Sequence, residues 1–522
     1  MDKKISRREM MKKAGVAAGA AGAATLLSVP IVAADPRAAQ QPGQSRQSGQ
    51  ANGTGQANQA EQDKAVMDKI LSQSSKTLLA EHEAYFVEIT AGDMVATFDK
   101  RYGSLRSITR KGDEFGTNFI GNEENTPGVD ASDSLWTGDI VSTVWELLGD
   151  WRNARLGQND VFKMSGKWKR EFTGKSADIR QVKHEGNTFH VSYNGQAANE
   201  QGLRSYRVGM TYRAGERNSI LWDIEIENLT GTTLEIGELG FPLMVNDDYA
   251  ELYYEPGGVE GISGGGNVAF SLTPLRQKLI HEQKVLVHHF IAGHSSYALV
   301  QRPLGDAPYL LVQPMEDTSF ECIYKERDSA FAAHTQWRGP DVLAIHSRAA
   351  KDLRGWHSNP WVNGHSSLLL QAGEKKNYQI RFAFVDSYEA IREEVYKAGN
   401  LGVRVVPSMV VQEETDVHVE VKSKGAIEKI KFLSDNIRVV DQKRDGEKTL
   451  LTLQFKKRGQ KSLKLQYGGN RWTNLHFYCI EDIGELLKAR GKFIVEREVC
   501  EELAAEEEEH VALLEGEMEQ LG

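Results

Sequence analysis

Cysteine is scarce in this 522-residue chain, which contains only Cys322, Cys479 and Cys500. The three are far apart and odd in number, so they form neither a CxxC pair nor a disulfide framework. We therefore expect buried or free thiols. The histidines of "HHFIAGHSSY" also lack the spacing of zinc ligands. The sequence predicts no metal site and implies no cofactor.

The chain also lacks an excess of positive charge. The chain has 63 Lys and Arg against 73 Asp and Glu, a formal charge of -10. A nucleic-acid backbone needs a basic face, so nucleic acid is not the expected partner. No apolar run provides a membrane span beyond the N-terminal segment. No repeat of 20–50 residues is present, which argues against a propeller or a solenoid.

Residues 1–34 have the pattern of an export signal. Arg7 and Arg8 follow Ser6, and a mildly apolar Ala/Gly-rich stretch leads to small residues ending at Ala34. The pattern resembles a twin-arginine signal cleaved near Ala34. That resemblance implies the twin-arginine export machinery as a partner and a periplasmic or extracellular location. An ordinary secretory signal and an uncleaved anchor are the alternatives.

Residues 35–80 are predicted to be a disordered linker with one short helix. Between Pro36 and Asp63 the chain is rich in Gln, Gly and Ser and has no aromatic or large aliphatic residue. Such a segment cannot bury enough apolar surface to offset the entropy of ordering.

The rest of the chain is mainly β in pattern. Short β-branched and aromatic runs separated by Gly-containing turns predict a large antiparallel β-supersandwich over 81–400. In "ILWDIEIENLT" the acids alternate with isoleucines, as in a half-buried strand. Residues 401–475 contain six or seven strand-like runs, which suits a small Ig-like β-sandwich. A C-terminal helix is expected within 476–522. Helix signals are otherwise few, the clearest running from Ser387 to Gly399.

Three stretches carry a resemblance to a known group. They are "VATFDKRYGSLRSITRKGDEFGTNFIGNEEN", "SLLLQAGEKKNYQIRFAFVDSYEAIREEVYKAGNLGVRVVPSMVV" and "NLHFYCIEDIGELLKARGKFIVERE". Together they resemble a secreted, poorly characterised family related to the six-hairpin glycosidases. The resemblance implies a β-sandwich first, then a linker, then an (α/α)6 toroid that carries the catalytic carboxylates.

The toroid needs about twelve helices, whereas the sequence after Asp482 has room for one. We therefore expect a helix from Asp482 to about Glu515 that is the start of a toroid, with the chain truncated before the rest. Its apolar side chains, among them Leu487, Phe493 and Ile494, are expected to be poorly covered. On this interpretation the chain carries no catalytic carboxylate of the toroid, and its catalytic residues are unknown.

Acids beside aromatic residues are the candidate sugar-binding groups, because a ring stacks on the apolar face of a sugar and a carboxylate accepts from its hydroxyls. Three loops offer them: "NEENTPGVDASDSLWTGDI", "FPLMVNDDYAELYYEPGG" and "RGWHSNPWVNGHSS". The predicted substrate-binding residues are Trp136, Asp139, Asp247, Asp248, Trp356, His357 and Trp361. Turn-forming acids and tryptophans packed under a loop are the structural alternative for each loop.

These observations predict an exported carbohydrate-active protein, the glycoside-hydrolase-like β-sandwich portion of a family member. Its partner would be a polysaccharide or oligosaccharide that it binds or helps to process. Two alternatives stay open. One is a non-catalytic glycan-binding or cell-surface module, and the other is a truncated product without activity.

Overall fold

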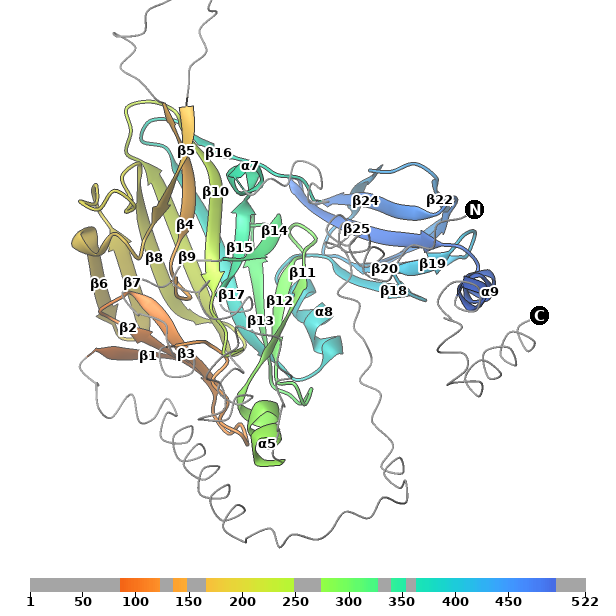
Figure 1. Ribbon diagram of the computed structural model, residues 1–522, viewed down its shortest axis with the longest axis horizontal. Coiled ribbons are helices and arrows are strands. Elements are labelled where there is room, and N and C mark those ends of the chain that lie inside the picture. Colours follow the sequence, from red (N-terminus) through yellow and green to blue (C-terminus); the bar gives the residue numbers. More distant parts are fainter. Residues whose placement is uncertain are drawn as a thin grey trace, which may run out of the picture. The chain divides into compact units, whose positions relative to one another are not determined.

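The computed structural model describes residues 85–122, 135–147, 166–247, 274–326, 339–353 and 363–493 (Figure 1). The mainly-β fold class predicted from the sequence is confirmed. Nearly all strand pairs are antiparallel, and the described strands form five sheets. None of the helices in this part of the chain is both long and apolar enough to cross a membrane.

An eight-stranded sheet forms one layer of the first sandwich, in the order β11-β12-β13-β17-β9-β8-β7-β6. Its strands are β6 (Arg180–Glu185), β7 (Thr188–Tyr193), β8 (Tyr206–Gly215), β9 (Ser219–Asn228), β11 (Leu286–Phe290), β12 (Tyr297–Gln301), β13 (Tyr309–Met315) and β17 (Lys375–Val385). The alternation predicted for β9 is confirmed. Trp222, Ile224 and Ile226 are buried, whereas Glu225 between them is exposed.

A six-stranded sheet forms the opposing layer, in the order β14-β15-β10-β4-β5, with β16 also paired to β10. Its strands are β4 (Val141–Leu147), β5 (Gly166–Phe172), β10 (Leu234–Leu243), β14 (Cys322–Lys325), β15 (Asp341–His346) and β16 (Leu368–Leu370). Trp222 of β9 meets Phe241 of β10 edge to face at 5.1 Å between ring centroids. That contact marks the core between the two layers.

A three-stranded sheet adds to the same core. Its strands are β1 (Phe86–Ala91), β2 (Met94–Asp99) and β3 (Ser104–Arg110). Phe98 of β2 packs on Phe189 of β7 at 4.8 Å and on Tyr212 of β8 at 4.6 Å. The first sandwich therefore buries one continuous apolar core that is shared by three sheets.

A second, smaller sandwich follows with a core of its own. Two four-stranded sheets have the orders β18-β20-β23-β22 and β19-β25-β24-β21, and β19 pairs with β25 in parallel. The strands are β18 (Gly402–Val406), β19 (Val410–Gln412), β20 (Val417–Lys422), β21 (Ile427–Phe432), β22 (Ile437–Asp445), β23 (Lys448–Phe455), β24 (Gly459–Tyr467) and β25 (Arg471–Ile480). The predicted small sandwich thus has eight strands.

Within the described residues the helices are short. Besides the 3-10 turn η1 (Ala177–Ile179), they are α5 (Pro274–Gln283), α7 (Arg348–Leu353), α8 (Tyr388–Lys397) and α9 (Ile483–Phe493). The start predicted for α8 is confirmed, because the Ser387 hydroxyl accepts from the Ala390 amide. Gly399 follows its end at a φ of 89°.

The start predicted for the last helix is also confirmed, since Asp482 Oδ1 accepts from the Glu485 amide at 3.1 Å. No side chain of α9 is buried, and Leu487 is 49% exposed. Phe493 is similarly exposed, as expected. Ile494 and the rest of the predicted helix lie outside the described residues.

Candidate saccharide-binding face

The outer face of the six-stranded sheet collects polar and aromatic side chains from its neighbouring strands. Along β4 and β5, Trp145 pairs with Trp168 and Thr143 pairs with Arg170. Thr143 also pairs with Glu238 of β10. Since directly paired residues in a sheet point to the same side, these five side chains share one face. Of their neighbours in the strands, Val144 and Leu239 point into the core.

This outer face is concave. Strands β5 and β14 stand at opposite ends of the five-strand path, four strand spacings or about 19 Å apart in a flat sheet. Yet Nη2 of Arg170, on β5, lies 2.9 Å from Oε2 of Glu326, which follows β14 directly. Two extended side chains cannot bridge the flat separation. The sheet must therefore curl toward its outer face.

Arg170 is the centre of the charge on this face. Its Nη1 and Nη2 both donate to Glu326, at 3.2 and 2.9 Å, and its Nε lies 4.0 Å from Oε2 of Glu238. Glu238 also accepts hydrogen bonds from the hydroxyls of Tyr324 and Thr143. We call these five residues the Arg170 cluster.

The Arg170 cluster is well buried at its base and open at its arginine. The side chain of Glu238 is 1% exposed, whereas that of Arg170 is 31% exposed. Burial alone would lower the pKa of Arg170, but its hydrogen bonds to Glu326 and the charge of Glu238 raise it. The guanidinium is therefore held charged, in a fixed orientation, with part of its surface open to a ligand.

Aromatic rings flank the cluster. Trp145 and Trp168 are half-buried and meet edge to face at 4.9 Å between ring centroids. Nε1 of Trp168 donates to Asp352 of α7 at 3.3 Å, which fixes the ring. The Arg170 guanidinium lies 4.9 Å from the ring centre of Phe172. Rigid aromatic surface beside fixed hydrogen-bonding groups is a combination that suits the apolar and hydroxyl faces of a sugar.

Asp247, predicted from the sequence, lies just past the end of β10 and belongs to a second charged group. Nζ of Lys325 is 3.0 Å from Oδ2 of Asp247 and 3.2 Å from Oδ2 of Asp341. His289 Nε2 lies 3.5 Å from Asp341 Oδ2. Lys325 follows Tyr324 on β14 and therefore points to the opposite side of the sheet. Asp247 thus follows the strand that carries Glu238 of the Arg170 cluster. Its partner Lys325, however, points to the inner side of the sheet, away from the cluster.

The pKa values in this second group follow from burial and pairing. Burial raises the pKa of Asp247, against the charge of Lys325. Burial also opposes ionisation of Asp341, but its hydrogen bond with His289 and the charge of Lys325 lower its pKa. Burial disfavours the charged form of Lys325, but Asp341 and Asp247 raise its pKa. Lys325 and Asp341 therefore stabilise each other's charged forms, whereas the charged form of Asp247 is disfavoured despite its contact with Lys325.

Trp136 and Asp139 lie in the interior. Trp136 is 1% exposed, and the Arg106 guanidinium lies 4.2 Å from its ring centre. Asp139 accepts from the Trp136 amide and from the Thr173 hydroxyl, both at 2.8 Å. Burial raises the pKa of Asp139. In this arrangement both residues fix the entry into β4, and the Trp136 ring faces protein.

The remaining predicted residues, Asp248, Trp356, His357 and Trp361, lie outside the described residues. The three loops singled out from the sequence nevertheless adjoin strands of one sheet. The first precedes β4, the second follows β10, and the third precedes β16. Because β4 and β16 both pair with β10, all three segments attach to the sheet that carries the Arg170 cluster.

Sequence reasoning missed the Arg170 cluster and its two tryptophans. One signal was present: in "GKWKREF" the residues Trp168, Arg170 and Phe172 follow one another at period two. In a strand this spacing puts an aromatic–arginine–aromatic row on one face. Among the described residues, no three His, Cys, Asp or Glu side chains are arranged to hold a metal ion.

Comparisons with known proteins agree with this architecture. Residues 269–505 match the model of a family described as "Family of unknown function (DUF5695)", which is less than half of the chain. A solved polysaccharide lyase superposes with a TM-score of 0.51 at 15% identity, over 78% of this chain and 50% of the lyase. The chain thus spans about half the length of that lyase. The likeness shows a shared fold.

Weaker superpositions involve epimerase-like proteins. A GalM/aldose epimerase homologue from C. elegans gives a TM-score of 0.32 at 12% identity, over 58% of this chain and 98% of its own. A putative aldose 1-epimerase from Escherichia coli K12 gives 0.31 at 11% identity, over 58% and 99%. Among curated protein sequences, none matches the chain.

Proposed function

We propose that this chain is the β-sandwich portion of an exported carbohydrate-active protein and binds a polysaccharide on the concave outer face of its six-stranded sheet. One observation carries the proposal. The Arg170 cluster lies at the base of a concave face and is flanked by two half-exposed tryptophans. The fold shared with a polysaccharide lyase supports it.

The two kinds of side chain on this face have complementary roles in the proposal. Trp145 and Trp168 stack on sugar rings. This contact favours a ligand that presents the C–H groups of a sugar ring to the flat surface of the indole. Arg170 donates to hydroxyl or ring oxygens, since it accepts no hydrogen bonds itself. Because its two glutamates hold its orientation, little side-chain entropy is lost on binding.

Binding, rather than hydrolysis, is the role proposed for these carboxylates. A glycoside hydrolase needs one carboxyl that holds a proton and another that is free to act as base or nucleophile. Here Glu326 is held by two bonds from Arg170, and Glu238 by two hydroxyls. The resemblance to six-hairpin glycosidases extends the proposal: the catalytic carboxylates would belong to a helical toroid, and this chain would hold the substrate.

We propose that the chain leaves the cytoplasm by the twin-arginine route. The signal would comprise residues 1–34 and the linker residues 35–80, followed by the two sandwiches over 81–400 and 401–475. Substituting Arg7→Lys and Arg8→Lys together is expected to leave unprocessed protein inside the cell. Fractionation and N-terminal sequencing measure this. Unchanged export with cleavage near Ala34 would exclude the twin-arginine route and leave a general secretory signal.

Affinity electrophoresis in polysaccharide-containing gels tests the binding proposal. The full chain is expected to be retarded by at least one polysaccharide, and a Trp145→Ala/Trp168→Ala variant is expected to lose about tenfold in affinity, since each aromatic contact contributes about 0.5–1.5 kcal/mol. Tyr478→Ala is the matched control, because Tyr478 is an exposed aromatic residue on the small sandwich. Equal mobility of all three proteins in every gel would reject the proposal.

The same polysaccharides also test the division between binding and cleavage. Incubation with the purified chain is expected to release no new reducing ends and no unsaturated ends. Cleavage that disappears in a Glu326→Gln variant would show instead that this face is catalytic.

A further inference from the structure

The charged groups of the concave face bear on which polysaccharides it accepts. This inference rests on the proposed function, because it concerns the ligand of the same face. Arg170 is the accessible charged member of the Arg170 cluster. Its side chain is 31% exposed, against 1% for Glu238 and 5% for Glu326. The N–H groups that Arg170 still offers, and the charges around them, therefore decide which ligand fits.

Protein carboxylates lie along both edges of the Arg170 guanidinium that could hold a ligand carboxylate. A guanidinium has five N–H donors and binds a carboxylate through two parallel bonds along one edge. Glu326 takes the edge formed by Nη1 and Nη2, at 3.2 and 2.9 Å. On the other edge, Nε lies 4.0 Å from Oε2 of Glu238. A ligand is therefore left with single N–H groups rather than an open pair.

Negative charge surrounds this arginine. Glu238 and Glu326 contact it, and Asp352 of α7 accepts from Nε1 of Trp168 at 3.3 Å. A carboxylate on a sugar would therefore approach one guanidinium among three carboxylates of the described residues, and like charges repel at such range. A sugar hydroxyl carries no net charge, and a single N–H is enough to bind it.

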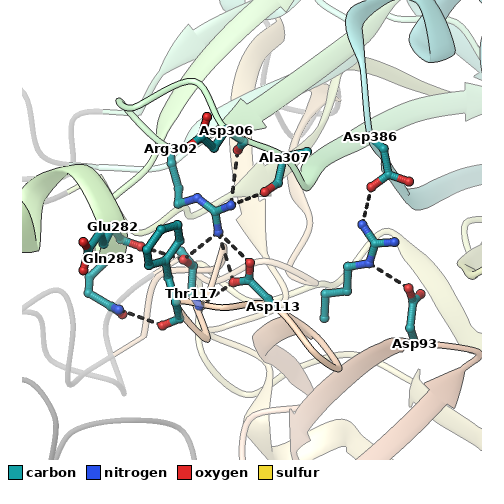
Figure 2. A network of polar contacts seen from close by, with 11 residues as sticks. Asp93, Asp113, Thr117, Glu282, Gln283, Arg302, Asp306, Ala307 and Asp386 are labelled. Atoms are coloured by element: carbon teal, nitrogen blue, oxygen red, sulfur yellow. Dashed lines mark hydrogen bonds and ion pairs between the residues drawn. The ribbon is translucent and has the colours of Figure 1, made fainter.

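Another arginine of the first sandwich shows the contrasting case of a structural pair (Figure 2). Arg302 Nη1 donates to both carboxylate oxygens of Asp113, at 2.9 and 3.0 Å, and its Nη2 donates to two backbone carbonyl oxygens. The side chains of Arg302 and Asp113 are 1% and 3% exposed. Arg302 therefore serves packing alone, whereas Arg170 has a similar carboxylate pair but stays open to solvent beside two aromatic rings.

From this geometry we propose that the concave face binds a neutral polysaccharide and rejects a polyuronate. Glu326 and Glu238 set this preference, because they line both edges of Arg170 and repel a ligand carboxylate. Trp145 and Trp168 contact the apolar faces of sugar rings, which neutral and acidic sugars share. The tryptophans therefore provide affinity, and the glutamates provide the choice between neutral and acidic ligands.

Matched pairs of polysaccharides test this preference by affinity electrophoresis of the unsubstituted chain. One pair is fully methyl-esterified polygalacturonate with its de-esterified form, and the other is a soluble β-glucan with the polyuronate made by oxidising its primary hydroxyls. In a pair that binds, the neutral member is expected to bind at least about tenfold more tightly. High salt is expected to reduce this preference, because it screens the repulsion.

The outcomes separate this inference from the proposed function. Equal or tighter binding of the acidic members would overturn the preference and leave polysaccharide binding intact. If no member of either pair retards the chain, while another polysaccharide does, the test is repeated with that polysaccharide and its oxidised form. Retardation by no polysaccharide at all rejects the proposed function, and the preference falls with it.

Glu326→Gln tests a residue that sets the preference. The change removes one negative charge beside Arg170, so the ratio of neutral to acidic affinity is expected to fall about tenfold. Glu225→Gln is the matched control, because Glu225 forms an exposed ion pair with Lys375 on the eight-stranded sheet, and its ratio is expected to stay unchanged. Since the ratio compares two ligands on one protein, a loss of folded protein affects both alike. An unchanged ratio in Glu326→Gln would overturn the inference.

Discussion

The two faces of the six-stranded sheet are built from the same strands and differ in chemistry. The inner face presents apolar side chains, among them Phe241 and Leu343, to the core shared with the eight-stranded sheet. The outer face presents Arg170 with its glutamates and two tryptophans, beside a small apolar cluster that packs against Ala350 of α7. Period-two alternation lets each strand serve both faces at once. The inner face accounts for stability, and the outer face is where we place recognition.

The largest expected effect lies on the inner face. Phe241→Ala removes a ring that is fully buried against Trp222, and we expect a loss of about 3–5 kcal/mol in the free energy of unfolding. Phe172→Ala makes the same change on the outer face, where the ring is only half-buried. Urea denaturation of both variants is expected to show a much smaller loss for Phe172→Ala. Equal losses would contradict the division between the faces.

A half-buried histidine gives the next effect. At the end of β15, His346 bonds to the hydroxyls of Ser366 and Tyr378, and burial, with Lys376, lowers its pKa from 6.5 to about 4. Between pH 6.5 and about 4, the unfolded chain therefore binds a proton at this histidine that the folded chain does not bind. The histidine's contribution, about 3 kcal/mol, is complete above pH 6.5 and is lost as the pH falls toward 4.

Thermal melts between pH 7 and pH 4 measure this effect. His346→Gln is expected to lose less stability across the window than the unsubstituted chain, although it starts from a lower melting temperature at pH 7. His294, whose pKa is also lowered by burial to about 4, contributes to the same window in both proteins. If the melting temperatures of the two proteins fell in parallel with pH, His346 would not be the source of the predicted loss of stability.

A smaller effect is expected at the Arg170 cluster. Arg170→Met leaves Glu238 and Glu326 without their cation and is expected to cost about 2 kcal/mol, less than a fully buried pair because Arg170 is partly exposed. Adding Glu326→Gln should recover part of the loss, since it removes one uncompensated charge. Arg213→Met, in an exposed pair, is expected to cost about 0.5 kcal/mol or less. Denaturant titrations compare all three, and no recovery in the double variant would argue against the ion pair.

Local sequence rules predicted much of the fold but little of the candidate site. The cap of α8 at Ser387 and the alternation of β9 depend on neighbouring residues, and both are observed. The contact between Arg170 and Glu326 joins residues 156 positions apart and exists only because the sheet curls. Trp136 beside an acid matched a sugar-site pattern, yet it is a core residue. Composition does not distinguish a buried tryptophan from an exposed one.

Oxidative footprinting of tryptophans is the most direct test of recognition on the outer face, because it uses the unsubstituted chain. With a polysaccharide that retards the protein, mass spectrometry is expected to show Trp145 and Trp168 protected from oxidation. Trp472, half-buried on the small sandwich, should react equally with and without polysaccharide. Unchanged reactivity of Trp145 and Trp168 while the polysaccharide is bound would contradict the proposal that the concave face binds it.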